Sequence, residues 1–413
     1  MYGWLAGVVG CGGSEGRVPV ELVGDADTET DTQAADSAGA ENPECLGLPT
    51  VPSTVVGPVA TSVGQSVTTR PSVAYSANGV YAVAWTPSSA EPGMMFVQRV
   101  SAGVALGAAV VVPPPLHFVV AAPAVATNDL GELVVTWVEA GSSSVFLQRF
   151  DGAGLPVGTA VQVSAPGHTA MGTSVALLPG GDALVAWGEQ GVLAQRVDPA
   201  GAFVFPDAVR ISDPAHAVLG EPALAADASG AFAVSYVDLG SNSVQLLRLD
   251  PAGAPIGALL DVTPASHLVT DAPSLASTPD GALVVAWTEV ASASVYVQRY
   301  DATGGSLGGA TQVSQSGLIA ANPMPGQVQL LQSVSMACDG SFVVGWTDPL
   351  VAFTPFLRRF DAVGAPLSDE EPYGVGQFTR APGIVAVDPG GGDHVMAWTD
   401  EASLQVQHQF LGL

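Results

Sequence analysis

A glycine followed six positions later by Trp or Tyr recurs seven times in this 413-residue chain, and the interval never changes by a residue. Successive aromatic residues of these pairs are 52, 50, 49, 51, 59 and 52 positions apart. The pairs are Gly79/Trp85, Gly131/Trp137, Gly181/Trp187, Gly230/Tyr236, Gly281/Trp287, Gly340/Trp346 and Gly392/Trp398. A period near fifty residues indicates one supersecondary unit repeated along the chain rather than several unrelated domains.

One copy of the repeat contains the signals of four short β-strands. In the fullest copy, Pro273–Ala276 is a short apolar run, Asp280-Gly281 is a hairpin turn, and residues 282–287 form an apolar strand ending in Trp. Residues 295–300 and 311–314 supply two further strands, with a glycine-containing turn between them. Four strands in about fifty residues predict one blade of a β-propeller, in which the flat Trp covers the contact to a neighbouring blade.

The two chain ends predict how the ring closes. The seventh repeat reaches only residues 409–411 and lacks a fourth strand, whereas residues 57–63, ahead of the first repeat, match the fourth-strand segments 154–163 and 253–262. Pairing of residues 57–63 with the C-terminal strands would leave no open sheet edge. We therefore expect an all-β fold, a seven-bladed β-propeller of four-stranded antiparallel blades, closed by an N-terminal strand that completes the last blade.

The first eleven residues are read as an export signal. Trp4–Gly10 is a short apolar stretch directly before Cys11, and it resembles the lipobox at which bacterial lipoproteins are cleaved and acylated on cysteine. The basic residues that usually precede such a stretch are missing, and an N-terminal strand with a buried cysteine is the alternative. The resemblance implies a lipid anchor through Cys11.

An acidic segment follows the signal. Residues 12–50 contain nine Asp or Glu, one Arg and no aromatic residue, which is too little apolar surface to support a fold. We expect a lipoprotein-type signal in residues 1–11, a disordered tether in 12–56 and the propeller in 57–413. Cys45 and Cys338 could form a disulfide in an oxidising envelope, but their positions give no spacing signal.

The blade pattern resembles repeats of a known kind. It reads Pro-Ser-Val-Ala, then Gly-x-Phe/Leu-Val-Val-x-Trp, then Gln-Arg-Phe/Tyr-Asp-x-x-Gly, and it covers residues 57–413. This pattern is similar to repeats in large bacterial surface (adhesin-like) proteins and in predicted lipoproteins. The resemblance implies an extracytoplasmic propeller, at the bacterial outer membrane or cell surface, and it implies no particular ligand.

The charge balance excludes some partners. The chain has 38 Asp and Glu against 11 basic residues, all of them Arg, and a net charge of −27. Its long-range field repels nucleic acid and anionic membrane surfaces. No nucleophile elbow, phosphate loop, zinc motif or calcium loop occurs in the sequence, so we expect no cofactor. We also expect a monomeric protein whose ligand is a glycan, a peptide or another protein.

One histidine recurs in each of the first four blades, in the loop that joins the fourth strand of the blade to the first strand of the next. Neutral imidazole is a good metal ligand, but equivalent atoms of adjacent blades lie about 10 Å apart, too far to share one ion. A hydrogen bond from each histidine to a neighbouring strand is therefore favoured over a metal site. The four residues are His117, His168, His216 and His267.

An arginine recurs in the third strand of six repeats, two positions before an Asp in five of them. We interpret this pattern as a structural Arg–Asp bridge at the blade edge rather than as a set of anion ligands. The six residues are Arg99, Arg149, Arg196, Arg248, Arg299 and Arg359.

Four charged residues outside the repeat pattern are the candidate site. Arg70 and Arg380 precede first strands of blades that adjoin across the ring closure, and together they could bind a carboxylate or sulfate, although solvated loop arginines are the simpler interpretation. Glu221 and Asp271 lie in equivalent loops and are the candidate acids of a glycan-processing enzyme.

Two functions stay open at this point. Short loops rich in Ala, Ser and Pro favour a cell-envelope, non-catalytic binding module whose ligand docks on the loop-rich face. The alternative is a secreted glycan hydrolase or lyase with its site at the channel mouth, where several propeller families carry such sites.

Overall fold

The structure is a computed structural model in which the chain divides into residues 1–40 and 41–413, and the described residues all belong to the second unit. None of them forms a helix long and apolar enough to cross a membrane. Predictions for residues 1–55, with Cys11 and Cys45, and for His117 and His168 fall outside the described residues. The structure describes residues 56–62, 67, 70–87, 94–112, 119, 121–167, 169–264, 267–269, 271–289, 292, 294–314, 332–348, 354–373, 379–387, 393–400 and 403–411.

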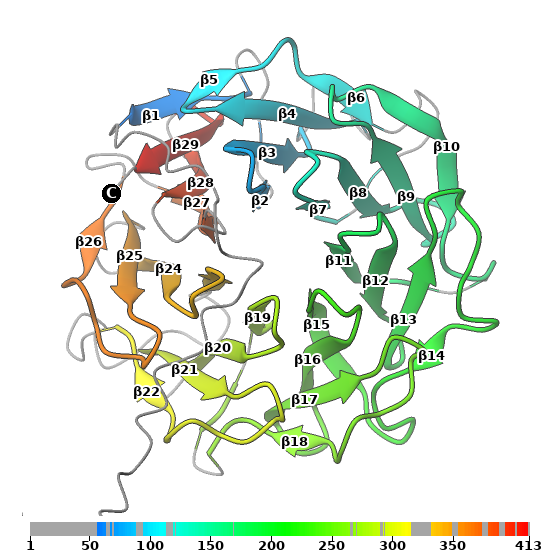
Figure 1. Cartoon of the computed structure of the whole chain (residues 1–413), viewed down its shortest axis with the longest axis vertical. Helices are drawn as coiled ribbons and strands as arrows, with labels where there is room; N and C mark the ends of the chain where they lie inside the picture. Colours follow the sequence, from blue (N-terminus) through cyan, green and yellow to red (C-terminus); the bar gives the residue numbers. More distant parts are fainter. Residues whose placement is uncertain are drawn as a thin grey trace, which may run out of the picture. The chain divides into compact units, whose positions relative to one another are not determined.

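Seven antiparallel sheets follow one another around a ring, as Figure 1 shows. In the first six, the strand nearest the axis comes first in the chain and the others pair outward in order. The outer strand of the first blade is interrupted, so β5 and β6 both pair with β4. The predicted seven-bladed architecture is confirmed.

The strands have the following bounds. Blade one contains β2 (Ser72–Tyr75), β3 (Val80–Trp85), β4 (Met95–Ser101), β5 (Val104–Ala105) and β6 (Val110–Val112); blade two, β7 (Ala124–Thr127), β8 (Leu133–Val138), β9 (Val145–Phe150) and β10 (Pro156–Gln162); blade three, β11 (Gly172–Leu177), β12 (Ala183–Gly188), β13 (Val192–Val197) and β14 (Val209–Arg210); blade four, β15 (Val218–Ala226), β16 (Phe232–Asp238), β17 (Ser243–Leu249) and β18 (Leu260–Asp261); blade five, β19 (Ser274–Ser277), β20 (Leu283–Glu289), β21 (Ser294–Tyr300) and β22 (Thr311–Gln312); blade six, β23 (Ser333–Met336), β24 (Phe342–Asp348), β25 (Thr354–Phe360) and β26 (Glu371–Pro372); and blade seven, β27 (Thr379–Val387), β28 (His394–Asp400), β29 (Val406–Leu411) and β1 (Val56–Ala60).

The last blade is built from both ends of the propeller sequence. Strand β1 pairs antiparallel with β29 and so supplies the fourth strand. The pairing continues beyond β1, because Thr61 N donates to Val406 O at 2.7 Å and Val406 N donates to Ser62 Oγ at 2.8 Å. The Thr61 hydroxyl also lies 2.7 Å from Nδ1 of the buried His408. Closure by the N-terminal strand is confirmed.

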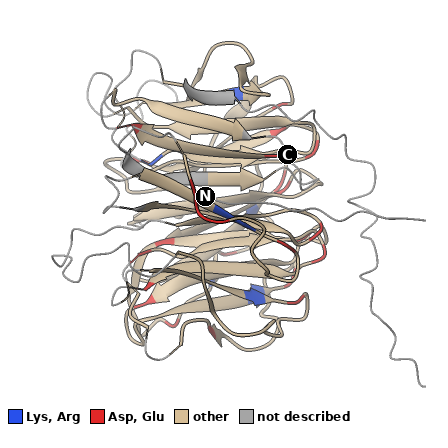
Figure 2. Cartoon of the chain, turned by 90° about the vertical axis from the view of Figure 1, so that its left-hand side faces the viewer, with Lys and Arg blue, Asp and Glu red and all other residues tan. Residues whose placement is uncertain are grey.

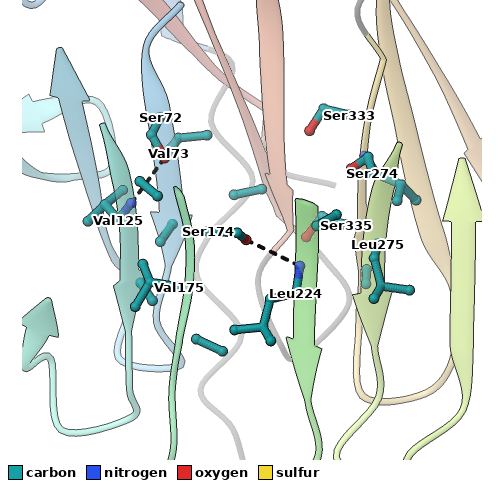
Figure 3. A pocket seen from close by; sticks show the side chains of 18 of the residues that line it. Ser72, Val73, Val125, Ser174, Val175, Leu224, Ser274, Leu275, Ser333 and Ser335 are labelled. Carbon is teal, nitrogen blue, oxygen red and sulfur yellow. Dashed lines mark hydrogen bonds between the residues drawn. The ribbon is translucent and has the colours of Figure 1, made fainter. Parts of the chain in front are cut away.

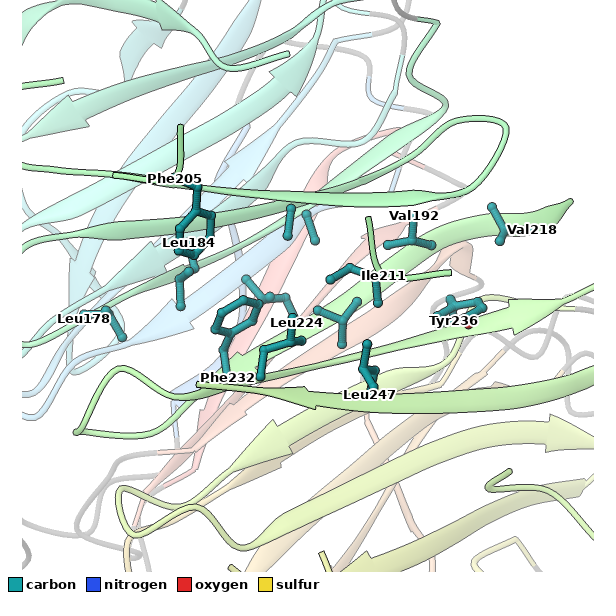
Figure 4. Packing of buried hydrophobic residues seen from close by; sticks show 14 residues of the cluster. Leu178, Leu184, Val192, Phe205, Ile211, Val218, Leu224, Phe232, Tyr236 and Leu247 are labelled. Carbon is teal, nitrogen blue, oxygen red and sulfur yellow. The ribbon is translucent and has the colours of Figure 1, made fainter. Parts of the chain in front are cut away.

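The hydrophobic core consists of seven clusters, each shared by two neighbouring blades. Figure 4 shows the cluster between blades three and four, where Leu184 and Val192 face Phe232 and Tyr236. The repeated aromatic residue of each blade belongs to the cluster shared with the preceding blade. Four of the tryptophans also stack on an aromatic ring of the adjacent strand, with centroids 5.7–6.0 Å apart, in the pairs Trp85–Phe96, Trp137–Phe146, Trp287–Tyr296 and Trp346–Phe356.

The recurrent arginines connect blades at the outer turns. Arg149 of blade two donates to three backbone carbonyls of blade three, those of Gly181 at 2.6 Å and of Val197 and Asp198 at 2.8 Å. Arg299 of blade five likewise donates to Ala362 O of blade six, at 2.6 Å. A planar guanidinium with several donors suits such a cluster of carbonyl oxygens.

The predicted bridge to the aspartate two residues later is therefore wrong, because these arginines bind backbone carbonyls of the next blade instead. The aspartate two residues after the arginine accepts hydrogen bonds from its own turn, as Asp151 Oδ1 does from the backbone N–H of Ala153 at 3.0 Å and of Leu155 at 2.8 Å. An Asx turn of this kind uses the carboxylate locally. Acidic residues accordingly colour many turns and strand ends in Figure 2.

Serines of the first strands connect the blades near the axis. The hydroxyl oxygen of each accepts the backbone N–H of the next blade, and Figure 3 shows two of these bonds. Blades two and four carry Ala124 and Ala223 at the same repeat position and lack the hydroxyl. The pairs are Ser72–Val125 at 3.2 Å, Ser174–Leu224 at 3.2 Å, Ser274–Val334 at 3.0 Å, Ser333–Val385 at 3.3 Å and Ser335–Val387 at 3.1 Å.

Removing one of these serine bonds should destabilise the ring, and adding one should stabilise it. We expect Ser174→Ala to lower the free energy of unfolding by about 1–2 kcal/mol, because the Leu224 N–H loses its acceptor. The reverse variant, Ala223→Ser, should raise it by about 0.5–1 kcal/mol by offering an acceptor to Leu275 N. Urea denaturation followed by tryptophan fluorescence measures both, and equal stability of Ser174→Ala and wild type would contradict the role of the bond.

Candidate functional site

A cavity of about 410 Å³ occupies the centre of the ring and is lined by the first strands of all seven blades. Its wall is made mostly of Ala, Ser and Val side chains, several of which Figure 3 shows. Tyr75 is the one aromatic residue among its described lining, and it is buried. The volume falls within the range of roughly 300–1,000 Å³ that is usual for small-ligand sites.

Two of the four predicted site residues line this cavity, and a third is adjacent in sequence to a lining residue. Arg70, just before β2, and Glu221, in β15, both line it. Asp271 precedes the lining residue Ala272 and is only 7% exposed. The charge of Arg70 acts on both carboxyl groups, although the three residues come from blades one, four and five. The fourth, Arg380, lies in β27, and its side chain falls outside the described part of the chain.

A β-bulge positions Glu221. The pairing of β15 with β16 shifts between Leu219 and Ala223, and Gly220 adopts a φ of 69°, which a residue with a side chain rarely does. Blade three makes room for this bulge with two glycines. A Cβ on Gly172 would lie 2.1 Å from Glu221 Cγ, and one on Gly188 would lie 2.8 Å from Gly220 O.

These two glycines shape the site, and the sequence analysis missed them. Gly172 is the first residue of β11 and Gly188 is the last residue of β12, and the two are paired with each other. A glycine within a strand marks close approach by another backbone or a ligand. That signal was present in the sequence, but the approaching residue comes from the next blade and could not be identified.

The segment carrying Asp271 is held from both sides. Gln332 of blade six donates from Nε2 to the carbonyl of Ala272 at 2.8 Å, and its Oε1 accepts from Thr288 Oγ1 at 2.7 Å. On the other side, the bulge of blade four packs close, since a Cβ on Gly220 would lie 3.4 Å from Ala272 Cβ. The Asp271 backbone is therefore fixed by its neighbours rather than by its own turn.

The charges of these groups influence one another, but the groups form no ion pair or hydrogen bond with one another. Among the described residues, no ion pair or hydrogen bond joins Arg70 to Glu221 or to Asp271. Arg70 Nε and Asp271 Oδ2 are both buried without a hydrogen-bond partner in the described part of the chain. Buried polar atoms are almost always satisfied by protein, water or ligand, so both atoms need a water or a ligand group as partner.

Burial shifts the pKa of each group in the direction that favours its neutral form. It lowers the pKa of the Arg70 guanidinium, an effect that Glu221 and Asp271 oppose. It raises the pKa of Glu221, and it raises that of Asp271 to about 6, with Arg70 opposing both shifts. Desolvation thus outweighs the attraction between the opposite charges.

The two described loop histidines lie away from this cluster. His216 Nδ1 is 3.0 Å from Asp238 Oδ2 at the end of β16, a contact that connects the loop to its own blade. The ring of His267 instead packs edge-on against Tyr296, with centroids 4.7 Å apart. Within the described ranges, no group of three His, Cys, Asp or Glu side chains could hold a metal ion.

Comparison with known proteins adds support for the fold alone. No protein-family model and no curated protein sequence matches the chain. Among solved structures, it is similar to a puromycin hydrolase mutant complexed with PGG (TM-score 0.50, 16% identity, 82% of this chain and 53% of that one). Other matches are the Dos1 propeller (TM-score 0.48, 11% identity, 87% and 95% covered) and the Penicillium chrysogenum α-L-arabinanase with arabinobiose (TM-score 0.46, 10% identity, 87% and 98% covered).

Removing the Asp271 charge should stabilise the ligand-free protein at neutral pH. The pKa of Asp271 is raised from 3.8 to about 6 by folding, so its contribution to stability is fully present below pH 3.8 and is lost as the pH rises through 6. We expect Asp271→Asn to raise the free energy of unfolding by about 1–3 kcal/mol at pH 7.5 and to change it little at pH 4.

Urea denaturation at both pH values measures this effect. The control is Asp207→Asn, which removes a carboxylate from an exposed position of blade three. Destabilisation by Asp271→Asn at both pH values would show instead that the carboxylate has a structural partner.

Proposed function

We propose that the chain is a non-catalytic binding module that takes its ligand at the Arg70, Glu221 and Asp271 cluster of the axial cavity. The observation that carries this proposal is the buried, unpartnered Oδ2 of Asp271 near a guanidinium that it does not touch. An unsatisfied buried polar group costs about 1–3 kcal/mol. A ligand that supplies the missing partners would recover that free energy on binding.

The rigidity of the cluster supports binding. Glu221 stands on a strand whose bulge is fitted to two glycines, and the Asp271 segment is fixed by Gln332. Groups held in place before the ligand arrives lose little conformational entropy when it binds. The axial site therefore has the preorganised geometry that a binding module needs.

Glycan hydrolysis is the alternative function at the same cluster. Hydrolysis by two carboxyl groups needs one kept protonated as the acid and the other ionised as base or nucleophile. Here burial raises both pKa values, and the charge of Arg70 opposes both shifts. The hydrolase alternative becomes an outcome of the experiment below.

The charge balance of the cluster constrains the ligand. One guanidinium and two carboxyl groups disfavour a purely anionic ligand. The carboxylate or sulfate site expected from Arg70 and Arg380 stays a prediction, because the Arg380 side chain lies outside the described part of the chain.

Location is a separate part of the proposal. The lipobox-like residues before Cys11 and the acidic segment after it support a lipid-anchored protein of the bacterial envelope, with the propeller facing solvent.

A ligand screen tests the binding function. We expect amino acids, short peptides or oligosaccharides to include a ligand that raises Tm in a saturable way, by about 2.7 kcal/mol of added stability at a hundredfold excess over Kd. The shift should disappear in Glu221→Gln/Asp271→Asn and persist in Asp207→Asn. Chromatography of the oligosaccharides detects cleavage, and cleavage that Glu221→Gln abolishes would establish the hydrolase instead. A screen without any shift would contradict the binding function.

Membrane fractionation tests the anchor. We expect the full-length protein expressed in a Gram-negative bacterium to incorporate labelled palmitate and to partition with membranes, because a thioether-linked lipid forms on Cys11. Cys11→Ser should be unlabelled and soluble. Equal partitioning of both proteins would rule out anchoring through this residue.

A further inference from the structure

We infer that the ligand of the axial cluster carries both an ammonium and a carboxylate group, as a free α-amino acid does. This inference rests on the proposed binding function and names its ligand class. It follows from the charges of three residues, the gap between them and the nature of the cavity wall.

The cluster offers complementary partners for both ends of such a zwitterion. Arg70 presents guanidinium donors in a planar fork that matches a carboxylate, and its Nε is the buried donor without a partner. Ionised Glu221 and Asp271 can only accept, which suits the three donors of an ammonium. The charge of Arg70 acts on both carboxyl groups, but Arg70 forms no ion pair or hydrogen bond with either. A ligand that bridges the guanidinium and the carboxyl groups therefore needs opposite charges close together.

The cavity wall disfavours a sugar as the main ligand. Sugar rings present flat C–H faces that usually pack on exposed aromatic rings, and the described lining contains only the buried Tyr75. The small Ala and Val side chains instead leave space for an aliphatic side chain. A net acidic cluster within a chain of charge −27 also disfavours a simple carboxylate.

The serines around the axis add donors for the same ligand. Ser72, Ser174 and Ser274 line the cavity and each accepts a backbone N–H from the next blade. Their hydroxyl hydrogens are then available to a carboxylate oxygen or to an intervening water, since a hydroxyl can donate while it accepts. The wall thus carries neutral donors on several sides of the charged cluster.

Matched ligands separate this inference from the binding function itself. Isothermal titration with the standard amino acids identifies the tightest one, which is then compared with its decarboxylated amine, its deaminated acid and methyl α-glucoside. We expect the amino acid to bind roughly 10- to 100-fold more tightly than either fragment, because each fragment leaves one charged partner unpaired.

The variants should change the preference in opposite directions. Arg70→Gln should weaken binding of the amino acid roughly tenfold or more and strengthen that of the amine, while Glu221→Gln/Asp271→Asn should weaken the amino acid and strengthen the acid. Gly172→Ala changes no charge, but its Cβ would displace Glu221, so it should also weaken the amino acid. Circular dichroism and Tm verify that each variant is folded.

The outcomes distinguish the two proposals. Binding of the glucoside that both charge variants weaken, without a gain for either fragment, would overturn the zwitterion and leave the binding function standing. Amino-acid binding that the charge variants do not change would overturn the assignment of the site. If the folded wild type binds neither amino acids nor the glucoside, the inference is overturned. The binding function is overturned only if the ligand screen described above also finds no ligand.

Discussion

The pairing of β1 with β29 is the constraint on which the rest of the structure depends. Without it, blade seven would lack its outer strand and present an open edge. Blades seven and one also share a hydrophobic core, where the rings of Tyr81 and Phe410 lie 6.3 Å apart and nearly parallel. Only a closed ring encloses the axial cavity, so the candidate site exists because the chain ends meet.

Closure also positions the site directly. Arg70 follows the closing strand by ten residues, and between them Val67 N donates to Leu404 O of blade seven at 2.6 Å and pairs with Pro87 of blade one. Arg70 therefore approaches the axis from a segment held by both blades at the seam. The acidic partners come from blades four and five, so the cluster is assembled across the ring rather than within one repeat.

The blades are joined at three distances from the axis. Serine hydroxyls connect first strands at the cavity, aromatic and aliphatic clusters fill the middle, and arginines reach the outer turns of the next blade. The pattern changes next to the seam. Blade seven takes its outer strand from β1, and Arg359 of blade six pairs with Glu371 of its own blade at 3.1 Å.

The period and the turn signals were enough to predict the number of blades, the place of the aromatic residues and the closing strand, because each depends on spacing along the chain. The partners of Arg149 and Ser174 were not predictable, since they belong to the next blade and depend on how two sheets pack. Glu221 and Asp271 were chosen from predicted loops, although Glu221 lies in β15, and their coupling to Arg70 depends on the width of a ring that no local pattern encodes.

The repeat offers a reason why this site can be specific without weakening the fold. Arg70 and Glu221 occupy the same repeat position, two residues before the serine or alanine of the first strand, where the other early blades carry Ala122, Gly172 and Ala272. Arg70, Ala122, Glu221 and Ala272 line the cavity, and the position takes no part in the serine, aromatic or arginine contacts between blades. In the first five blades, three copies carry small residues, and charged residues at the other two give the cavity its chemical character. Changes at this position can thus alter what the cavity accepts, while the contacts that hold the ring together stay the same.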